Sequence, residues 1–191
     1  YVHPDSVWAI NRIANEAVNL AGKLPLGPVH INVPIREPFY PLVSEELTPS
    51  GKLRVIEQTS TEPCLSADVW IEVLNEWDDA SKILIVGGQH AKSERLNKAL
   101  SKITEELDVP VVADSIANLA GSDLFIYHQD FILSGDRAEP DLAPDLLITY
   151  GLSLMSKELK IFLRKYPATK HWHIGNDGVW ADPLQSVTRQ I

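Results

Sequence analysis

The sequence is organised around residues 83–90, which read Ile83-Leu84-Ile85-Val86-Gly87-Gly88-Gln89-His90. Four apolar residues in a row, three of them β-branched, are typical of a strand that is covered on both faces. The two glycines that follow let the chain turn sharply out of the strand. This stretch therefore predicts a central strand of a parallel sheet, with helices packed on both sides.

The segments around this strand alternate between strand-like and helical periodicity, which is typical of right-handed βαβ units. The sequence predicts an α/β fold: a Rossmann-like parallel sheet of about six strands with helices on both faces, preceded by an N-terminal helix-strand segment. The predicted strands are Leu53–Gln58, Lys82–Val86, Val109–Ala113, Leu146–Tyr150, His171–Ile174 and a last one near Val187–Ile191. The predicted helices are Ser66–Asp78, Ser93–Leu107 and Met155–Tyr166.

The N-terminal third has a different character. Start signals at Pro4, Asp5 and Ser6 and apolar residues at helical spacing predict a helix that ends at Gly22, followed by a strand over Val29–Val33. Four prolines and a glycine then predict an interdomain linker over residues 34–51, so that the sheet domain occupies 52–191. Because Tyr1 is not a methionine and no leader pattern follows it, we expect an excised piece of a longer protein.

Composition narrows the classes of function. The 191 residues are 45% hydrophobic and carry 17 basic against 26 acidic side chains, a net charge of -9. That charge disfavours nucleic acid and anionic membranes as partners, and no apolar run is long enough to cross a bilayer. A single cysteine, Cys64, excludes an internal disulfide, and we expect a cytoplasmic protein.

Ligands of doubly wound sheets bind beyond the carboxyl ends of the strands, so the residues at those ends are the candidates for a cleft. Glycines there could bring backbone amides close to a phosphate, but neither the dinucleotide fingerprint nor the Walker A pattern is present. The cleft-lining candidates are Gly87, Gly88, Gln89, Asp114, Ser115, Gly151 and Ser153, together with His128 and Arg137 from the long connection that runs to Pro144.

Other polar residues have ordinary structural interpretations. Asp114 has no acidic partner in its neighbourhood, and a helix cap or turn is its favoured role. His171 and His173 share one face of a strand without a carboxylate at a fixed offset, so we predict no metal site. The stretch around His128 is either a functional connection or a surface excursion with one helical turn. We name no catalytic and no cofactor-binding residue.

Residues 27–41 read Gly27-Pro28-Val29-His30-Ile31-Asn32-Val33-Pro34-Ile35-Arg36-Glu37-Pro38-Phe39-Tyr40-Pro41 and resemble the close of the pyrimidine-binding domain in thiamine-diphosphate-dependent enzymes. The resemblance is closest to the SEPHCHC synthase family of menaquinone biosynthesis. Further resemblance lies in Val111–Ser115, in Asp145–Lys160 and in His171–Ile174, and together these stretches span nearly the whole chain.

The resemblance implies that the chain is the central Rossmann-like domain, preceded by the C-terminal tail of the pyrimidine-binding domain at residues 1–33. In the family, thiamine diphosphate and Mg²⁺ are held by the two flanking domains, so this chain is expected to be noncatalytic, with no cofactor of its own. The parent enzyme decarboxylates 2-oxoglutarate and adds the succinyl unit to isochorismate.

The resemblance also bears on partners. The family can offer a basic residue to the anionic second substrate from the loop before the Asp145 strand; residues 127–131 hold no lysine or arginine, and Arg137 is the nearest cation. Expected partners are the N- and C-terminal domains of the same enzyme and further copies in a homo-oligomer, with residues 1–33 docked on their own chain or exchanged with another copy. The alternative is an independent module that binds FAD, NAD or ADP.

Overall fold

The computed structural model of the chain describes residues 3–23, 26–34, 54–59, 64–120, 122–134, 140–175 and 181–191. The chain divides into two compact units, residues 1–63 and residues 64–191. Each unit is described by itself below.

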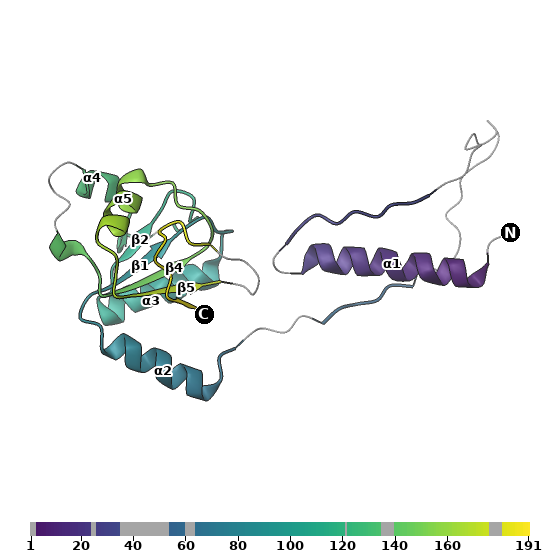
Figure 1. Cartoon of the computed structure of the whole chain (residues 1–191), viewed down its shortest axis with the longest axis horizontal. Helices are drawn as coiled ribbons and strands as arrows, with labels where there is room; N and C mark the ends of the chain where they lie inside the picture. Colours follow the sequence, from purple (N-terminus) through teal and green to yellow (C-terminus); the bar gives the residue numbers. More distant parts are fainter. Residues whose placement is uncertain are drawn as a thin grey trace. The chain divides into compact units, whose positions relative to one another are not determined.

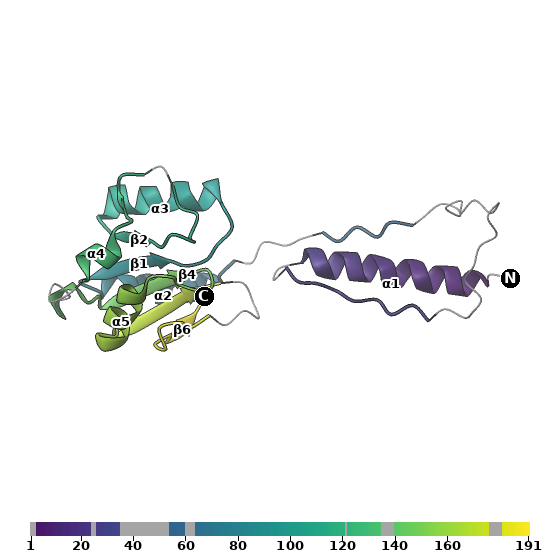
Figure 2. The ribbon, with the colours of Figure 1, turned by 90° about the horizontal axis from the view of Figure 1, so that it is seen from above.

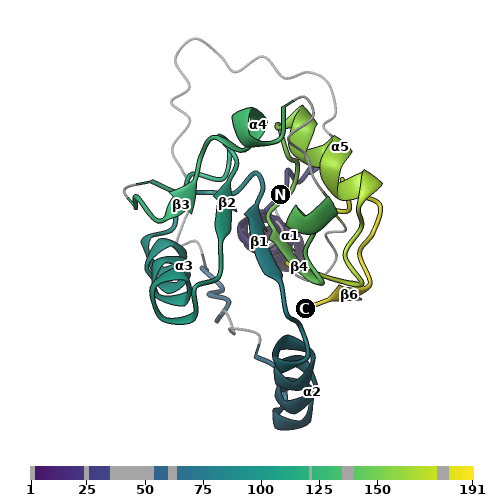
Figure 3. The ribbon, with the colours of Figure 1, turned by 90° about the vertical axis from the view of Figure 1, so that its left-hand side faces the viewer.

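The second unit is built on a six-stranded sheet in which every pairing is parallel. The strand order is β3-β2-β1-β4-β5-β6, and Figure 3 shows β3, β2, β1 and β4 side by side. This order reverses direction between β1 and β4, as in a doubly wound Rossmann sheet, which confirms the predicted fold class. The strands are β1 (Ile83–Gly87), β2 (Val111–Ala113), β3 (Phe125–Ile126), β4 (Leu146–Tyr150), β5 (Lys170–Ile174) and β6 (Arg189–Gln190).

Helices cover both faces of this sheet (Figure 2). On one face, α2 (Ala67–Asp78) and α3 (Glu94–Leu107) contribute Val73 and Leu100 to a core that includes Ile85 and Trp172. On the other face, α5 (Lys157–Lys165) packs Leu159, Phe162 and Leu163 against Val86 and Leu147. The alternating side chains of each strand thus feed two separate apolar layers, which is why β1 and β4 read as continuous apolar runs.

Serine residues start three of the helices. The hydroxyls of Ser66, Ser93 and Ser156 accept hydrogen bonds from the amides of Val69, Leu96 and Leu159, each the third residue of its helix. An N-cap of this kind satisfies an amide that the helix itself cannot pair. The ends of α2, α3 and α5 lie within two residues of the predicted ends, so these three predicted helices are confirmed.

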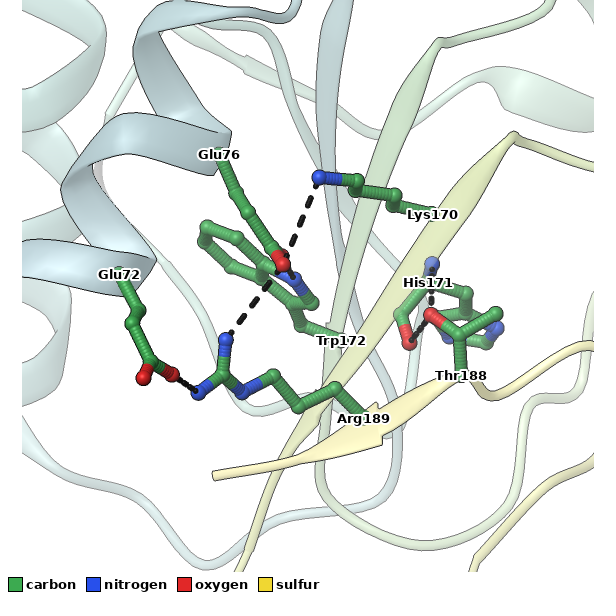
Figure 4. Close-up of polar contacts among 7 residues, drawn as sticks. All are labelled: Glu72, Glu76, Lys170, His171, Trp172, Thr188 and Arg189. Carbon is green, nitrogen blue, oxygen red and sulfur yellow. Dashed lines mark hydrogen bonds and ion pairs between the residues drawn. The ribbon is translucent and has the colours of Figure 1, made fainter. Parts of the chain in front are cut away.

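A polar cluster attaches α2 to the last two strands (Figure 4). The indole Nε1 of Trp172 donates to Glu76 Oε2 at 2.8 Å, and Lys170 lies 3.4 Å from Glu76 Oε1. Arg189 of β6 donates to Glu72 Oε2 at 2.8 Å and also lies 3.5 Å from Glu76 Oε1. These contacts place two carboxylates of one helix face over the edge of the sheet.

The sequence did not predict strand β3 or the short 3-10 turn before β4 as separate elements. Strand β3 has only two residues, and the helical turn α4 (Gln129–Ile132) follows it directly, with a short 3-10 turn at Pro140–Leu142. The single helical turn was one of the two interpretations of this stretch. A two-residue strand is too short for a periodicity to be read from the sequence.

The first unit contains the helix α1 (Pro4–Gly22), and residues 26–34 and 54–59 run along its two sides (Figure 1). The helix confirms the prediction, but the predicted strands at Val29–Val33 and Leu53–Gln58 are wrong, because neither described segment is a strand of the sheet. Asn15 takes the place of a strand partner: its Oδ1 accepts from Ile56 N–H at 2.6 Å and its Nδ2 donates to the Arg54 carbonyl at 2.9 Å.

Some predictions fall outside the described residues. Most of the predicted linker, residues 35–51, and the candidate Arg137 belong to this group. The predicted domain boundary at residue 52 stays a prediction. Among the helices in the described ranges, none has the length and apolar character needed to cross a membrane.

Candidate functional site

The carboxyl ends of the strands meet at one edge of the sheet. Gly87, the last residue of β1, is in register with Ala113 of β2 on one side and with Tyr150 of β4 on the other. The candidates that follow these strands, including Asp114 and Gly151, therefore lie at the same edge. This confirms the predicted convergence, which follows from the parallel direction of the strands.

The turns after β1 and β4 are bonded to each other. Gly88 N–H donates to the Tyr150 carbonyl at 2.9 Å, Gln89 N–H donates to the Ser153 carbonyl at 2.8 Å, and Leu152 N–H donates back to the Gln89 carbonyl at 2.9 Å. Gly151 has a φ of 80°, and a Cβ on it would lie 2.6 Å from the Gln89 carbonyl oxygen.

These contacts explain the glycines without a ligand. The amides of Gly88 and Gln89, which a phosphate would need, already donate to carbonyl oxygens of the neighbouring turn. The geometry therefore favours a structural role for this glycine pattern, and it counts against the FAD, NAD or ADP module as the alternative.

Tyr150, the last residue of β4, is buried at this edge of the sheet. Its ring meets His90 edge-to-face with centroids 5.7 Å apart, and its buried hydroxyl has no hydrogen-bond partner among the described residues. Burial raises the pKa of the Tyr150 hydroxyl far above its ordinary range. The group therefore stays neutral and is a poor candidate for proton transfer.

Asp114 is a clamp between β2 and the start of α5. Its Oδ1 accepts from Ser115 N–H at 2.6 Å, and its Oδ2 accepts from the amides of Met155 and Ser156 at 2.5 and 3.1 Å. The residue is 3% exposed. This arrangement favours a structural role for Asp114, since both carboxylate oxygens are engaged by backbone N–H groups.

A pocket of about 600 Å³ opens beside this clamp. Its walls come from the end of β2, from α4 and from the first turn of α5, and Ser156 Oγ joins two of them by donating to Asp130 Oδ1 at 2.6 Å. The lining residues include Asp114, Ser115, Gln129, Asp130, Ser156 and Lys157.

Two lining residues of this pocket offer unused polar groups. Gln129 is 6% exposed, and its Oε1 has no partner among the described residues. Lys157 is exposed, is the one cation among the described residues that line the pocket, and stands at the N-terminal end of α5, where the helix dipole also favours an anion. Asp114, Asp130 and Glu158 also line the pocket. The first two carboxylates accept hydrogen bonds within the chain, so Lys157 is the lining group that could contact an anion.

A second pocket of about 500 Å³ lies where the strand order reverses. Gln89, Ser115 and Asn118 are among its lining residues. Asn118 has a positive φ of 53°, and its Nδ2 donates to the His90 carbonyl at 2.6 Å. This hydrogen bond joins the segment after β2 to the segment after β1 at the pocket.

The remaining candidates are dispersed. His128 precedes α4 as an exposed residue and lines neither pocket, and Ser153 contributes its carbonyl to the turn contacts described above. Sequence reasoning did not select Ser156 and Lys157, although a serine before an amphipathic helix is a recognisable helix start and the next residue must lie at the strand-end edge.

His171 and His173 lie on the α5 side of the sheet, because their neighbours in register are Leu147 and Thr149. Thr149 Oγ1 lies 2.8 Å from His171 Nε2 and 3.0 Å from His173 Nδ1. Burial lowers the pKa of His171 to about 4 and lowers the pKa of His173. Both imidazoles are therefore neutral hydrogen-bonding groups at neutral pH.

We expect Asp114→Asn to lower the free energy of unfolding by about 2–3 kcal/mol, because the new amide nitrogen must face an N–H donor in either orientation. Ser115→Ala is the matched control, since it removes a weaker hydroxyl contact of 3.3 Å to the same carboxylate and should cost less than about 1 kcal/mol. Urea denaturation of the three proteins measures both values. Equal losses in the two variants would contradict the clamp.

No family model matches the chain, but individual proteins do. It is 36% identical over 190 residues to the 2-succinyl-5-enolpyruvyl-6-hydroxy-3-cyclohexene-1-carboxylate synthase of Cytophaga hutchinsonii. The synthases of the same name from Porphyromonas gingivalis and Bacillus velezensis are 33% and 31% identical over 186 and 195 residues.

These alignments cover 97–99% of the chain but only 32–33% of each relative. The chain thus spans about a third of the length of the curated relatives that it matches. Over nearly all of its residues, the chain is thus similar to one third of the 2-succinyl-5-enolpyruvyl-6-hydroxy-3-cyclohexene-1-carboxylate (SEPHCHC) synthases.

Proposed function

We propose that the chain is the central, noncatalytic part of a SEPHCHC synthase that acts in the cytoplasm in menaquinone biosynthesis. The observation that carries this proposal is a match over 98% of the chain to 33% of a synthase. The whole enzyme would decarboxylate 2-oxoglutarate on thiamine diphosphate and add the succinyl unit to isochorismate.

The central part would space the two domains that hold the cofactor. Its own residues do not fit thiamine diphosphate and Mg²⁺: the sequence contains no Gly-Asp-Gly, and the described residues include no group of three or more His, Cys, Asp or Glu side chains arranged for a metal ion. We therefore assign no step of the reaction to a residue of this chain.

The carboxyl edge of the sheet would border the substrate cleft of the whole enzyme. The pocket beside Asp114 supports this, because Lys157 lines it without an ion pair to any described residue. A free ammonium group at the start of a helix would attract an anionic substrate. Lys157 would thus supply the cation that residues 127–131 lack.

We expect the isolated chain neither to bind thiamine diphosphate with Mg²⁺ nor to consume 2-oxoglutarate, because both halves of the cofactor site lie on other parts of the enzyme. Isothermal titration calorimetry measures the binding, with a longer polypeptide that carries all the synthase domains as the positive control. Stoichiometric binding by the 191-residue chain would contradict this assignment. Titration with FAD, NAD and ADP tests the nucleotide-binding alternative in the same instrument.

In the whole enzyme, we expect Lys157→Met to raise the KM for isochorismate about 10- to 100-fold, the loss of one charged hydrogen bond, while the KM for 2-oxoglutarate changes little. Methionine keeps an unbranched chain of similar size and removes the ammonium group with its charge and its hydrogen-bond donors. Lys165→Met, at the opposite end of α5, is the matched control. An unchanged KM for isochorismate in the Lys157 variant would remove this residue from the substrate cleft.

Self-association is the last part of the proposal. The helix α1 has no buried side chain, and Trp8, Ile10 and Val18 are all more than half exposed. Apolar faces of this size are usually covered by another copy or another domain. Exchange of residues 1–33 between two copies would cover this face.

We therefore expect multi-angle light scattering to find a dimer of the chain and a monomer of a version that begins at Cys64, the first residue of the second compact unit. Both proteins are measured with a reducing agent, because Cys64 is exposed and could form an intermolecular disulfide. A monomeric full chain at high concentration would rule out the exchange.

A further inference from the structure

The last described segment, residues 181–191, is bonded to β5, and we call it the C-terminal strap. It is also held by ion pairs of Arg189 with α2, by a hydrogen bond from Arg164 of α5, and by the buried side chain of Leu184. Thr188 brackets the backbone of His171: its N–H and hydroxyl donate to the His171 carbonyl at 2.8 and 3.0 Å, and its Oγ1 accepts from His171 N–H at 2.9 Å (Figure 4). Ile191 N–H donates to the His173 carbonyl at 2.9 Å. The strap is therefore bonded to the same two histidines whose rings are buried.

The ring of His171 also reaches the strap. Its Nδ1 lies 2.8 Å from Ser186 Oγ, while its Nε2 lies 2.8 Å from Thr149 Oγ1. Thr149 Oγ1 in turn lies 3.0 Å from His173 Nδ1. Ser186, His171, Thr149 and His173 thus form one continuous chain of hydrogen bonds from the strap across β5 to β4.

This chain of hydrogen bonds is complete when both imidazoles are neutral. A neutral ring has one donor and one acceptor nitrogen, so Thr149 Oγ1 can accept from one ring and give its single hydrogen to the other, or to the Trp172 carbonyl at 3.5 Å. When both rings are protonated, both nitrogens that face Thr149 are donors, and two positive charges stand on either side of one oxygen atom. That state is disfavoured by repulsion and by burial, since His171 is 0% and His173 4% exposed.

We propose that the C-terminal strap is a pH-sensitive latch, docked on β5 while His171 and His173 are neutral and released when they become protonated. Release would free Ser186 and Thr188 from β5 and open both imidazoles to water, where the charged form is well solvated.

The charged groups around the latch have different effects on it. Asp182 of the strap favours protonation of both imidazoles, whereas His173 disfavours protonation of His171. Arg164 of α5 donates from Nε to the Pro183 carbonyl at 3.1 Å, which adds a contact between the strap and α5. Arg189 and Lys170 pair with Glu72 and Glu76 on the opposite face of the sheet.

The sign of the effect follows from the direction of the pKa shifts. Burial lowers the folded-state pKa of His171 from 6.5 to about 4, so the docked strap binds fewer protons than the released strap between these values. Docking is thus fully favoured above about pH 6.5 and weakens as the pH falls toward 4.

Hydrogen exchange of the 191-residue chain, followed by NMR and corrected for intrinsic exchange rates, tests this directly. If release exposes His171 fully, its pKa shift from 6.5 to about 4 lowers the protection of Thr188 and Ile191 amides ~40-fold between about pH 6.5 and about pH 4.5. Amides in the middle of β1 and β4 should change much less. Imidazole nitrogen shifts in the same samples report the protonation of the two rings.

Controls separate the histidines from the carboxylates. The double variant Glu72→Gln, Glu76→Gln removes the acid-sensitive pairs on the other face and should keep the pH dependence of the strap. His171→Asn, which keeps a donor and an acceptor but does not titrate, should abolish most of it. Equal loss of protection in strap and core, no loss in the strap, or a pH dependence that disappears with the glutamates would each overturn the latch.

Discussion

The parallel direction of all six strands is the constraint on which the rest of the second unit depends. Each strand must be followed by a crossover before its neighbour can begin, so helices cover both faces and the carboxyl ends collect at one edge. At that edge the chain has to leave β1, β2 and β4 within a small space. Gly88 and Gly151 allow the close approach of two turns there, and Asp114 accepts the backbone amides at the start of α5.

These contacts favour structural roles for Gly88, Gln89 and Asp114. The amides of Gly88 and Gln89 and both oxygens of Asp114 are engaged within the chain. In the pocket between α4 and α5, Lys157 is an exposed cation without an ion pair to a described residue, and Gln129 Oε1 is buried without a partner among the described residues. On the function proposed above, this edge of the sheet would border a cleft of the longer synthase, of which the chain matches about a third.

Polar contacts also attach two other elements, α2 and the C-terminal strap, to strand β5. On one face, Trp172 and Arg189 attach α2 through its two glutamates; on the other, Thr149 links the rings of His171 and His173. Alternation along β5 directs successive side chains to these two faces, so one short strand holds a helix and the C-terminal strap at once. The buried imidazoles make the second attachment sensitive to protonation, whereas the first depends on surface ion pairs.

Local patterns in the sequence determined most of the sheet domain. The run Ile83–Val86 and the helical periodicity of α3 and α5 are short-range signals, and each predicted its element correctly. Tertiary structure alone decided three things, because each depends on residues far apart in the chain. The segments 29–33 and 54–58 are rich in β-branched residues, as strands are, but no strand lies beside them in the part of the chain that the structure describes, and Asn15 supplies the backbone partner of Ile56 instead. The two residues of β3 become a strand only by pairing with β2, and Lys157 becomes a pocket residue only because α4 and the end of β2 are brought beside it.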